Sequence, residues 1–372
     1  MIRYSLIFLM ISLAVLLPGI NISKKNQFHD NPHDLTVTKG LTGYFSLCIL
    51  FHHITIMFSQ IPGMENEFPI IKQIGVLLVG FFFLFSGYGL IVSYEEKENY
   101  MKTFVIRRIC TVLLPYFICN YIYMTATLLA GNEFTMKQLI LAFFGLILLN
   151  DHMWFAVEIM ILYMVFFLIF RFVSKEKYKI IFMGLFIILL IVFSFLLGHE
   201  YTITQMTWFH GEWWYNTTFL FFLGMLFAKH RKKCLAFAKK HYTPLLLIFT
   251  GLFLFLWKGT EYMLANYGYW TETPFSKGYT DKLVTLAVQL PMVITFEIWL
   301  LLILLKVRVH NRLLAFLGKI SLELILLQNV FLLCFEDTFY ADFGLYVILS
   351  TACTLALAII INRIKLIILE KK

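Results

Sequence analysis

Two adjacent histidines, His52 and His53, lie near the end of an apolar stretch that runs from Gly40 to Phe58. The stretch is long enough to cross the hydrocarbon core of a bilayer, where an ionisable side chain is costly and marks a functional site by default. Because histidine titrates near neutral pH, it is suited to proton transfer. Adjacent helical positions point about 100° apart, so we expect one of the two rings to face a site. The alternative is that both imidazoles only hydrogen-bond neighbouring helices.

Two later apolar stretches also carry polar side chains. One opens with His152 and Trp154, and Glu158 follows one turn deeper, while the other holds Ser321 and Gln328. A tryptophan at a helix end is typical of a membrane interface, and serine and glutamine are typical of hydrogen bonds between membrane helices. A carboxylate as deep as Glu158 is harder to explain by packing. All five residues are therefore candidates for a site.

A basic pair and a stretch of aromatic and small residues could bind a donor molecule. Guanidinium groups bind phosphate bidentately, so Arg107 and Arg108 would hold a phosphorylated donor at the cytoplasmic face. The alternative is a basic anchor of the kind that membrane topology alone produces. Within Phe81–Gly89, the small residues Ser86 and Gly87 allow either close helix packing or the approach of a ligand chain to the backbone.

The composition is that of a polytopic membrane protein. Of 372 residues, 60% are hydrophobic and 14% charged, whereas about a quarter are charged in soluble proteins. The net charge of +9 comes from Lys and Arg in short loops between apolar runs, so we expect a lipid bilayer and no nucleic acid as partner. The segment His29–Asp34 lacks a further ligand cluster, and no metal site is expected. No P-loop, G-x-S-x-G or H-E-x-x-H motif occurs.

Twelve apolar runs lack the alternation of strands and are therefore expected to be helices, because only helices and closed barrels span membranes. They are Tyr4–Ile20, Gly40–Phe58, Ile74–Tyr94, Ile109–Ala130, Leu139–Leu149, Met153–Val173, Ile180–Gly198, Trp213–Ala228, Thr243–Trp257, Leu283–Leu305, Ala315–Phe335 and Phe343–Leu369. The sequence predicts an all-α fold, a polytopic membrane helical bundle.

Basic loops set the predicted topology. Glu95–Arg108, Arg171–Lys179 and Lys229–Tyr242 are rich in Lys and Arg, which places them in the cytoplasm. The alternation of sides works only if one run does not span, and the shortest, Leu139–Leu149, is the candidate for a re-entrant or half helix. About ten core transmembrane helices remain. Tyr4–Ile20 is an additional N-terminal helix, which we favour over a cleaved signal peptide.

The chain divides into an N-terminal transmembrane helix with a cytoplasmic linker, residues 1–38, and one membrane domain, residues 39–372. At a rise of about 1.5 Å per residue, His53 lies about 20 Å beyond Gly40, in the outer half of the membrane. The same reasoning places Gln328 at a similar depth and His152 at the outer mouth. Polar groups are thus expected in the outer half of the membrane, and the basic pair Arg107 and Arg108 at the cytoplasmic face.

The order of these motifs resembles that of the acyltransferase 3 family of integral membrane acyltransferases, from about Leu41 to the last helix. The family pattern opens with a basic residue and Gly, and an apolar run then ends in His. Here Thr42 stands in place of the basic residue and His53 takes the histidine position. Four further elements match the family pattern in order: the aromatic and Ser-Gly element Phe81–Gly87, the basic helix start Arg107–Tyr116, the His-x-Trp-Phe element His152–Phe155 and the Gly-x-Ile-Ser element Gly318–Gln328. In the last of these, Gln328 replaces a histidine.

The resemblance implies a membrane-bound O-acyltransferase that moves an acyl group, most often acetyl, from cytoplasmic acyl-CoA to a hydroxyl of an extracytoplasmic or lipid-linked glycan. No bound cofactor is implied, and the setting is polysaccharide O-acetylation at a bacterial cell membrane. The resemblance implies that His53 is the general base, with His52 and Glu158 also in the catalytic set. On the donor side it implies Arg107, Arg108, Ser86 and Gly87. On the acceptor side it implies His152, Trp154, Gln328 and Ser321. The oligomeric state is left open.

Two alternatives remain at this point. A glycan or lipid transporter or flippase would use the same intramembrane polar groups as a substrate path. Such proteins often contain inverted repeats, and the sequence shows none. The other alternative is an acyltransferase-like protein with impaired catalysis, which the residue Thr42 favours because a basic partner of His53 is missing.

Overall fold

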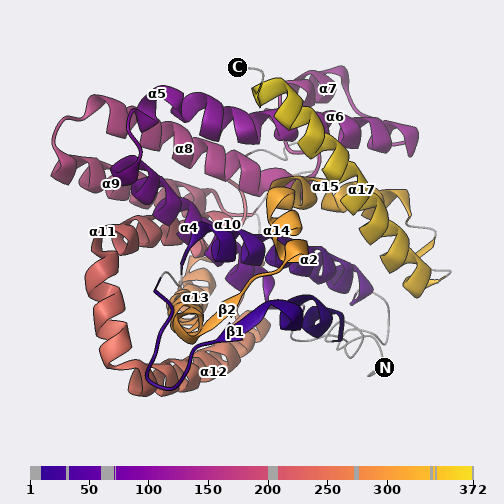
Figure 1. Ribbon diagram of the computed structural model, residues 1–372. Coiled ribbons are helices and arrows are strands. Elements are labelled where there is room, and N and C mark those ends of the chain that lie inside the picture. Colours follow the sequence, from indigo (N-terminus) through magenta and orange to yellow (C-terminus); the bar gives the residue numbers. More distant parts are fainter. Residues whose placement is uncertain are drawn as a thin grey trace.

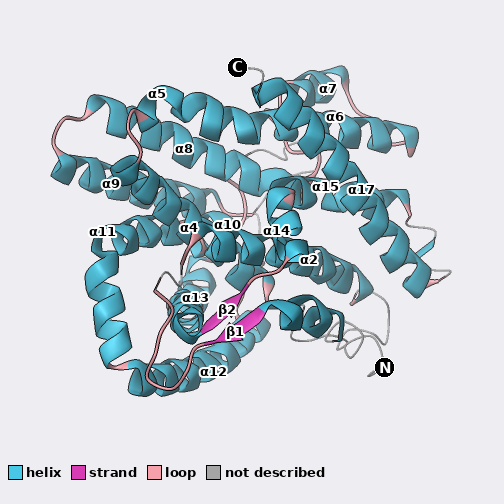
Figure 2. Cartoon of the chain, viewed as in Figure 1, coloured by secondary structure: helices cyan, strands magenta, loops and turns pink. Residues whose placement is uncertain are grey.

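The computed structural model describes residues 10–30, 33–59, 71, 73–199, 208–271, 276–335, 338–339 and 342–370. Helices make up almost all of the described chain (Figure 1). The described strands are β1 (Ile20–Ile22) and β2 (Val307–Val309), which pair antiparallel. They lie together beside α13, at the front of the view in Figure 2. The predicted all-α bundle is confirmed.

Eight of the described helices are long and apolar enough to cross a membrane. They are α2 (Leu35–Phe58), α4 (Gly75–Glu96), the continuous run of α5 and α6 (Tyr100–Leu129), α8 with its leading turn (Asp151–Phe172), α9 (Glu176–Leu197), α12 (Tyr242–Asn266), α13 (Tyr279–Lys306) and α17 (Phe343–Glu370). The chain is therefore a multi-pass membrane protein.

Among the described residues eight candidate spans are found, where about ten core helices were predicted for the whole chain. Two helices, α14 (Arg312–Lys319) and α15 (Ser321–Cys334), would form a ninth span together, but they bend by 72° at the break between them. The predicted run Trp213–Ala228 begins in a short helix, α10 (Trp213–Asn216), and continues into α11 (Phe219–Lys240). Because the second half of α11 is strongly basic, this helix does not have the composition of a span.

The short predicted run Leu139–Leu149 does not span, as expected. Its helix, α7 (Met136–Phe143), has only eight residues and begins with a capping box between Thr135 and Gln138. The chain then turns at Gly145, whose φ of +68° favours glycine, so the helix cannot continue.

The predicted N-terminal helix Tyr4–Ile20 lies partly outside the described residues. The described part is the short apolar helix Met10–Gly19, whose last turn is η1 (Leu17–Gly19). Ile20 already belongs to β1, since the pairing with β2 takes over at that residue. The N-terminal segment is thereby tied to the end of α13.

Two close backbone contacts fix the centre of the bundle. Helices α4 and α11 cross at Gly87 and Gly224. A Cβ atom added to Gly87 would lie 1.9 Å from the carbonyl oxygen of Phe221, and one added to Gly224 would lie 1.9 Å from the carbonyl oxygen of Leu84. Helix α14 crosses α2 near the centre of Figure 1. There a Cβ on Gly43 would lie 2.3 Å from the backbone nitrogen of Gly318. Small residues let membrane helices approach this closely.

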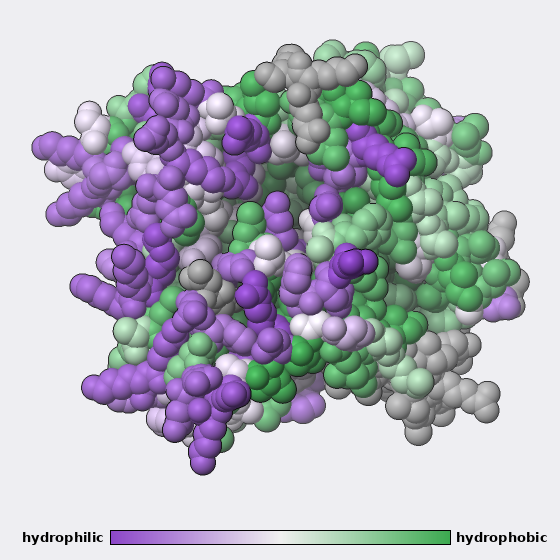
Figure 3. Space-filling model, viewed as in Figure 1, coloured by the Kyte–Doolittle hydropathy of each residue, from purple (hydrophilic) through white to green (hydrophobic). Residues whose placement is uncertain are grey.

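Hydrophilic side chains gather at one end of the molecule. In Figure 3 they cover the left of the view, where α9, α11 and the turn between α4 and α5 lie. We call this the basic end and define it by Lys97, Arg107, Lys175 and Arg231. Arg231 is anchored there by ion pairs to Glu95 and Glu96, at 2.6 and 3.2 Å.

Candidate transferase site

The structure brings together two histidines from separate elements. The ring centroids of His53, on α2, and His152, in the turn η3 (Asp151–Met153), are 3.8 Å apart, with the rings tilted by 48°. Both side chains are half-buried, so neither is sealed inside the bundle. The ring of His52 lies 5.1 Å from that of His53, and its Nδ1 is 3.0 Å from the carbonyl oxygen of Ile71. One of the two adjacent histidines thus faces a second histidine, and the other contacts the segment before α4.

The position of His152 depends on Asn150, a residue that sequence reasoning missed. Asn150 is fully buried, and its side-chain oxygen accepts a hydrogen bond from the His152 backbone N–H at 3.1 Å. Its Nδ2 donates to the carbonyl oxygen of Leu326, on α15, at 3.3 Å. Asparagine at the start of a helix is a familiar capping signal, and it could have drawn attention to this residue.

Gln328 contacts α2 at a level different from that of His53. Its Nε2 donates to the carbonyl oxygen of Ser46 at 3.3 Å, seven residues before His53, or about 10 Å along the helix. Asn150 and Gln328 thus link the histidine pair and α2 to the same helix, α15.

Thr42 lies well away from the histidine pair. Its hydroxyl donates to the carbonyl oxygen of Thr38 at 2.8 Å. Eleven residues separate Thr42 from His53, which is about 16 Å along α2. A basic side chain at position 42 would therefore lie near the crossing with α14 and not beside the imidazole.

Glu158 is fully buried one turn into α8 (Trp154–Phe172). One carboxylate oxygen accepts a hydrogen bond from the hydroxyl of Thr218, the N-cap residue of α11. The other has no hydrogen-bond partner among the described residues. Glu158 lies six residues after His152, so it is about 9 Å deeper in the bundle.

Trp154 packs in an aromatic stack beside the histidine pair. Its ring lies 5.3 Å from that of Trp213, with 23° between the planes, and 6.3 Å from that of Phe83. Offset aromatic stacking of this kind holds both tryptophans in place. The residue is half-buried, so its ring also borders the surface near His152.

The arginine pair is separated by the local backbone. Arg107 and Arg108 lie in η2 (Val105–Cys110), a π-helical turn that connects α5 (Tyr100–Phe104) to α6 (Thr111–Leu129). Arg108 turns inward, where its Nε donates to the hydroxyl of Tyr100 at 2.9 Å and its Nη2 to that of Ser93 at 3.3 Å. Arg107 is exposed. Turns of the π type often occur at functional sites, and nothing in the sequence signalled this one.

Three other predicted site residues lie away from the histidine pair. Gly87 is at the crossing of α4 with α11, and Ser86 is its half-buried neighbour. Ser321, expected on the acceptor side, begins α15 at the kink instead, and its hydroxyl donates to the carbonyl oxygen of Gly318 at 3.4 Å. Gly318 touches Lys39 near the start of α2, so the tertiary packing places Ser321 near that end of α2.

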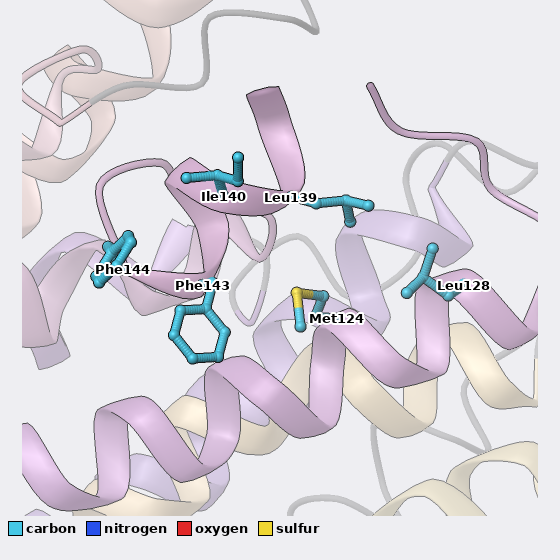
Figure 4. A pocket seen from close by; sticks show the side chains of 6 residues that line it. All are labelled: Met124, Leu128, Leu139, Ile140, Phe143 and Phe144. Atoms are coloured by element: carbon cyan, nitrogen blue, oxygen red, sulfur yellow. The ribbon is translucent and has the colours of Figure 1, made fainter. Parts of the chain in front are cut away.

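An apolar groove opens between α6 and α7, with a volume of about 310 Å³ (Figure 4). Met124 and Leu128 line it from α6, and Leu139, Ile140, Phe143 and Phe144 line it from α7 and its end. A reactive site combines an apolar pocket with a few converging polar groups. None of the lining residues is polar, so this groove lacks the groups of a reactive site.

The segment that had been considered for a metal has other contacts in its described part. His33 packs among the rings of Phe85, Tyr88 and Phe227, at 5.3 to 6.5 Å. Burial lowers the pKa of His33 to about 4. Asp34 caps α2 and pairs with Arg308 at 2.7 Å, and hydrogen bonds from Thr36 together with this cation hold its carboxyl pKa below the usual value. Among the residues described, no three His, Cys, Asp or Glu side chains are grouped to hold a metal.

Comparison with curated proteins and with solved structures returned no match to this chain. A family model described as an acyltransferase domain, Acyl_transf_3, matches residues 43–363. The match includes the histidine pair, Arg108 and the kink between α14 and α15. Because it covers most of the 372 residues, the protein belongs to the acyltransferase 3 family and is a membrane acyltransferase.

Proposed function

We propose that the protein transfers an acyl group, acetyl in the first place, from acyl-CoA to a hydroxyl of an extracytoplasmic or lipid-linked glycan. The observation that carries the proposal is the contact between His53 and His152, which come from different elements and lie far from the basic end. The basic end is the cytoplasmic one by the distribution of Lys and Arg. The setting that fits is the cell membrane of a bacterium, with polysaccharide O-acetylation as the process.

The histidine pair has the groups that acyl transfer needs. A neutral imidazole has one nitrogen that accepts a hydrogen bond and one that donates, so two adjacent rings offer two of each. The acceptor nitrogen of His53 takes the proton of the glycan hydroxyl as its oxygen attacks the thioester carbonyl. The N–H of His152 donates to the carbonyl oxygen, on which negative charge develops. The new C–O bond forms, the C–S bond breaks, and His53 passes the proton to the leaving thiolate.

The donor must reach this pair from the basic end. Arg108 is fixed there by Tyr100 and Ser93, and we propose that it binds a phosphate of the donor. The pantetheine arm then extends along α2 toward His53. This arrangement lets a cytoplasmic thioester modify an acceptor on the other side of the membrane.

The test is transfer of label from acetyl-CoA labelled in the acetyl group to envelope glycan in isolated membranes. We expect His53→Ala to lower the transfer rate about 10²- to 10⁴-fold, since a general base contributes that much. The adjacent His52→Ala is the matched control, because its ring bonds the Ile71 carbonyl, and a much smaller loss is expected. Equal transfer by wild type and His53→Ala would contradict the mechanism.

A transporter remains the second candidate because of two buried carboxyl groups. Both oxygens of Glu297, on α13, and one oxygen of Glu158 have no hydrogen-bond partner among the described residues. Uncompensated carboxyl groups inside a membrane protein are typical of ion and substrate paths. Substrate movement into vesicles without any transfer of label would favour this function.

A further inference from the structure

A carboxylate beside the histidine pair has no role in the acyl transfer proposed above. Asp151 lies in η3, directly before His152, and its side chain is half-buried. An aspartate at the start of a helix is usually a cap. Here Asn150 has that role, because its side-chain oxygen accepts a hydrogen bond from the His152 backbone N–H at 3.1 Å. Capping therefore does not explain why an aspartate stands at this position.

The carboxylate of Asp151 is uncompensated in the described part of the chain. No residue there donates a hydrogen bond to it, and no Lys, Arg or His forms an ion pair with it. A half-buried carboxylate at the start of a membrane span is costly unless a donor or a cation compensates it. A bound ligand that donates hydrogen bonds would remove this cost.

Two polar side chains from other helices converge near Asp151. The strongest charge interaction of the Tyr123 hydroxyl, on α6, is with Asp151. The same hydroxyl accepts a hydrogen bond from Nδ2 of Asn329, on α15, at 3.4 Å. Tyr123 is 7% exposed, so packing holds its ring in place. We call Asp151, Tyr123 and Asn329 the polar cluster.

The polar cluster lies toward the end of the bundle that is remote from the basic end. The next charge interaction of Tyr123 is with Cys334, which is exposed at the end of α15 that points away from the kink. Asp151 and His152 are neighbours in the chain, and the ring of His152 lies 3.8 Å from that of His53. A glycan whose hydroxyl reaches His53 would therefore have the polar cluster within the length of one or two sugar units.

We infer that Asp151 binds a second hydroxyl group of the acceptor glycan and thereby selects a neutral sugar at this point. An ionised carboxylate only accepts hydrogen bonds, and sugar hydroxyls donate them. Such bonds are stronger than those between neutral groups. A phosphate or a uronic acid in the same place would be repelled by Asp151, because like charges are unfavourable where no cation joins them.

The inference rests on the proposed function and adds to it the chemical class of the acceptor and the role of Asp151. Its residues are separate from Arg108 and from the path of the donor. A carboxylate also binds the ammonium group of an amino sugar. The experiment must therefore separate a hydroxyl from an ammonium group.

The test is binding of fluorescently labelled oligosaccharide, released from envelope glycan, to full-length protein in nanodiscs. We expect Asp151→Ala to weaken binding about 10- to 100-fold and Tyr123→Phe about 2- to 10-fold, because a hydrogen bond to a charged group is worth more than a neutral one. Asp281→Asn is the matched control. It removes a carboxylate from the first turn of α13, and binding should equal that of wild type.

A charged version of the same ligand tests the selection. Oxidation of the primary hydroxyls of the oligosaccharide to carboxylates should weaken binding to wild type more than binding to Asp151→Asn, which has the same shape but no charge. The same weakening in both proteins would overturn the selection by charge. Loss of binding after the amino groups of the oligosaccharide are acetylated would identify an ammonium group as the ligand and overturn the inference.

Kinetics distinguish a binding residue from a positioning residue. In the transfer assay, Asp151→Asn should raise KM for the glycan about tenfold and leave kcat and KM for acetyl-CoA unchanged. A lower kcat with an unchanged KM for the glycan would overturn the inference, because Asp151 would then act only through His152.

Equal binding of the oligosaccharide by wild type and Asp151→Ala would also overturn the inference. Binding with the expected pattern but no acyl transfer would uphold the role of Asp151 and overturn the proposed function. Acyl transfer that does not depend on Asp151 would do the reverse.

Discussion

At the residue scale, His53 and His52 differ in what their rings touch. His53 lies against His152, whereas His52 bonds a backbone carbonyl. The choice between them depends on the orientation of one helix, which is set by its neighbours. Asn150 acts on the pair through His152, so it is a positioning residue and not a catalytic one.

We predict that Asn150→Ala lowers kcat about tenfold or more and destabilises the protein by about 1–3 kcal/mol, because it leaves two buried backbone groups without partners. Asn120 is the control. It is 2% exposed, and its Nδ2 donates to the Ala142 carbonyl oxygen at 2.7 Å, away from the histidines. Asn120→Ala should cost similar stability but keep kcat per folded molecule. Equal loss of kcat in both variants would assign Asn150 a purely structural role.

At the element scale, glycines decide how the helices cross. The contact of Gly87 with the Phe221 carbonyl holds α4 against α11, and that of Gly43 with Gly318 holds α2 against the kink. The first crossing positions the helix that carries Ser93, and the second positions Lys39. The elements that carry Ser93 and Lys39 are therefore held by backbone contacts at small residues.

We predict that Gly87→Ala destabilises the protein by about 1–3 kcal/mol, because the added methyl group must push α4 and α11 apart. Gly89 is the matched control, since a Cβ there meets nothing within 4 Å. Thermal unfolding in detergent should show a lower Tm for Gly87→Ala and an unchanged Tm for Gly89→Ala. A rise in KM for the donor without a change in Tm would instead support a channel beside Gly87.

At the scale of the whole molecule, the proposed function requires its two chemical roles to be separated along the bundle. Lys39 and His53 are fourteen residues apart, which is about 21 Å. Donor phosphates and acceptor hydroxyl would therefore be recognised at different depths of one bundle. This separation is useful only if the basic end faces the cytoplasm.

Two native cysteines test that orientation. Cys234 is exposed on the basic half of α11, and Cys334 is exposed at the end of α15 that points away from the kink. In variants that keep only one of them, a membrane-impermeant maleimide should label Cys334 in intact cells. It should label Cys234 only after permeabilisation. The opposite pattern would invert the topology.

The sequence by itself determined that the chain is a bundle of membrane helices, because run length and hydropathy are local properties and a bilayer admits few alternatives. Spacing of motifs was enough to propose His53 and the pair Arg107 and Arg108 as site residues. It also indicated the family, which the match over residues 43–363 confirms.

Only the tertiary structure decided the partners of those residues. The contact of His53 with His152 and the bridge through Asn150 join segments far apart in the chain. The kink placed Ser321 near the start of α2, and the crossing at Gly87 fixed α4. Such placements depend on how helices rotate and bend against one another, and a uniformly apolar sequence does not encode this in any local pattern.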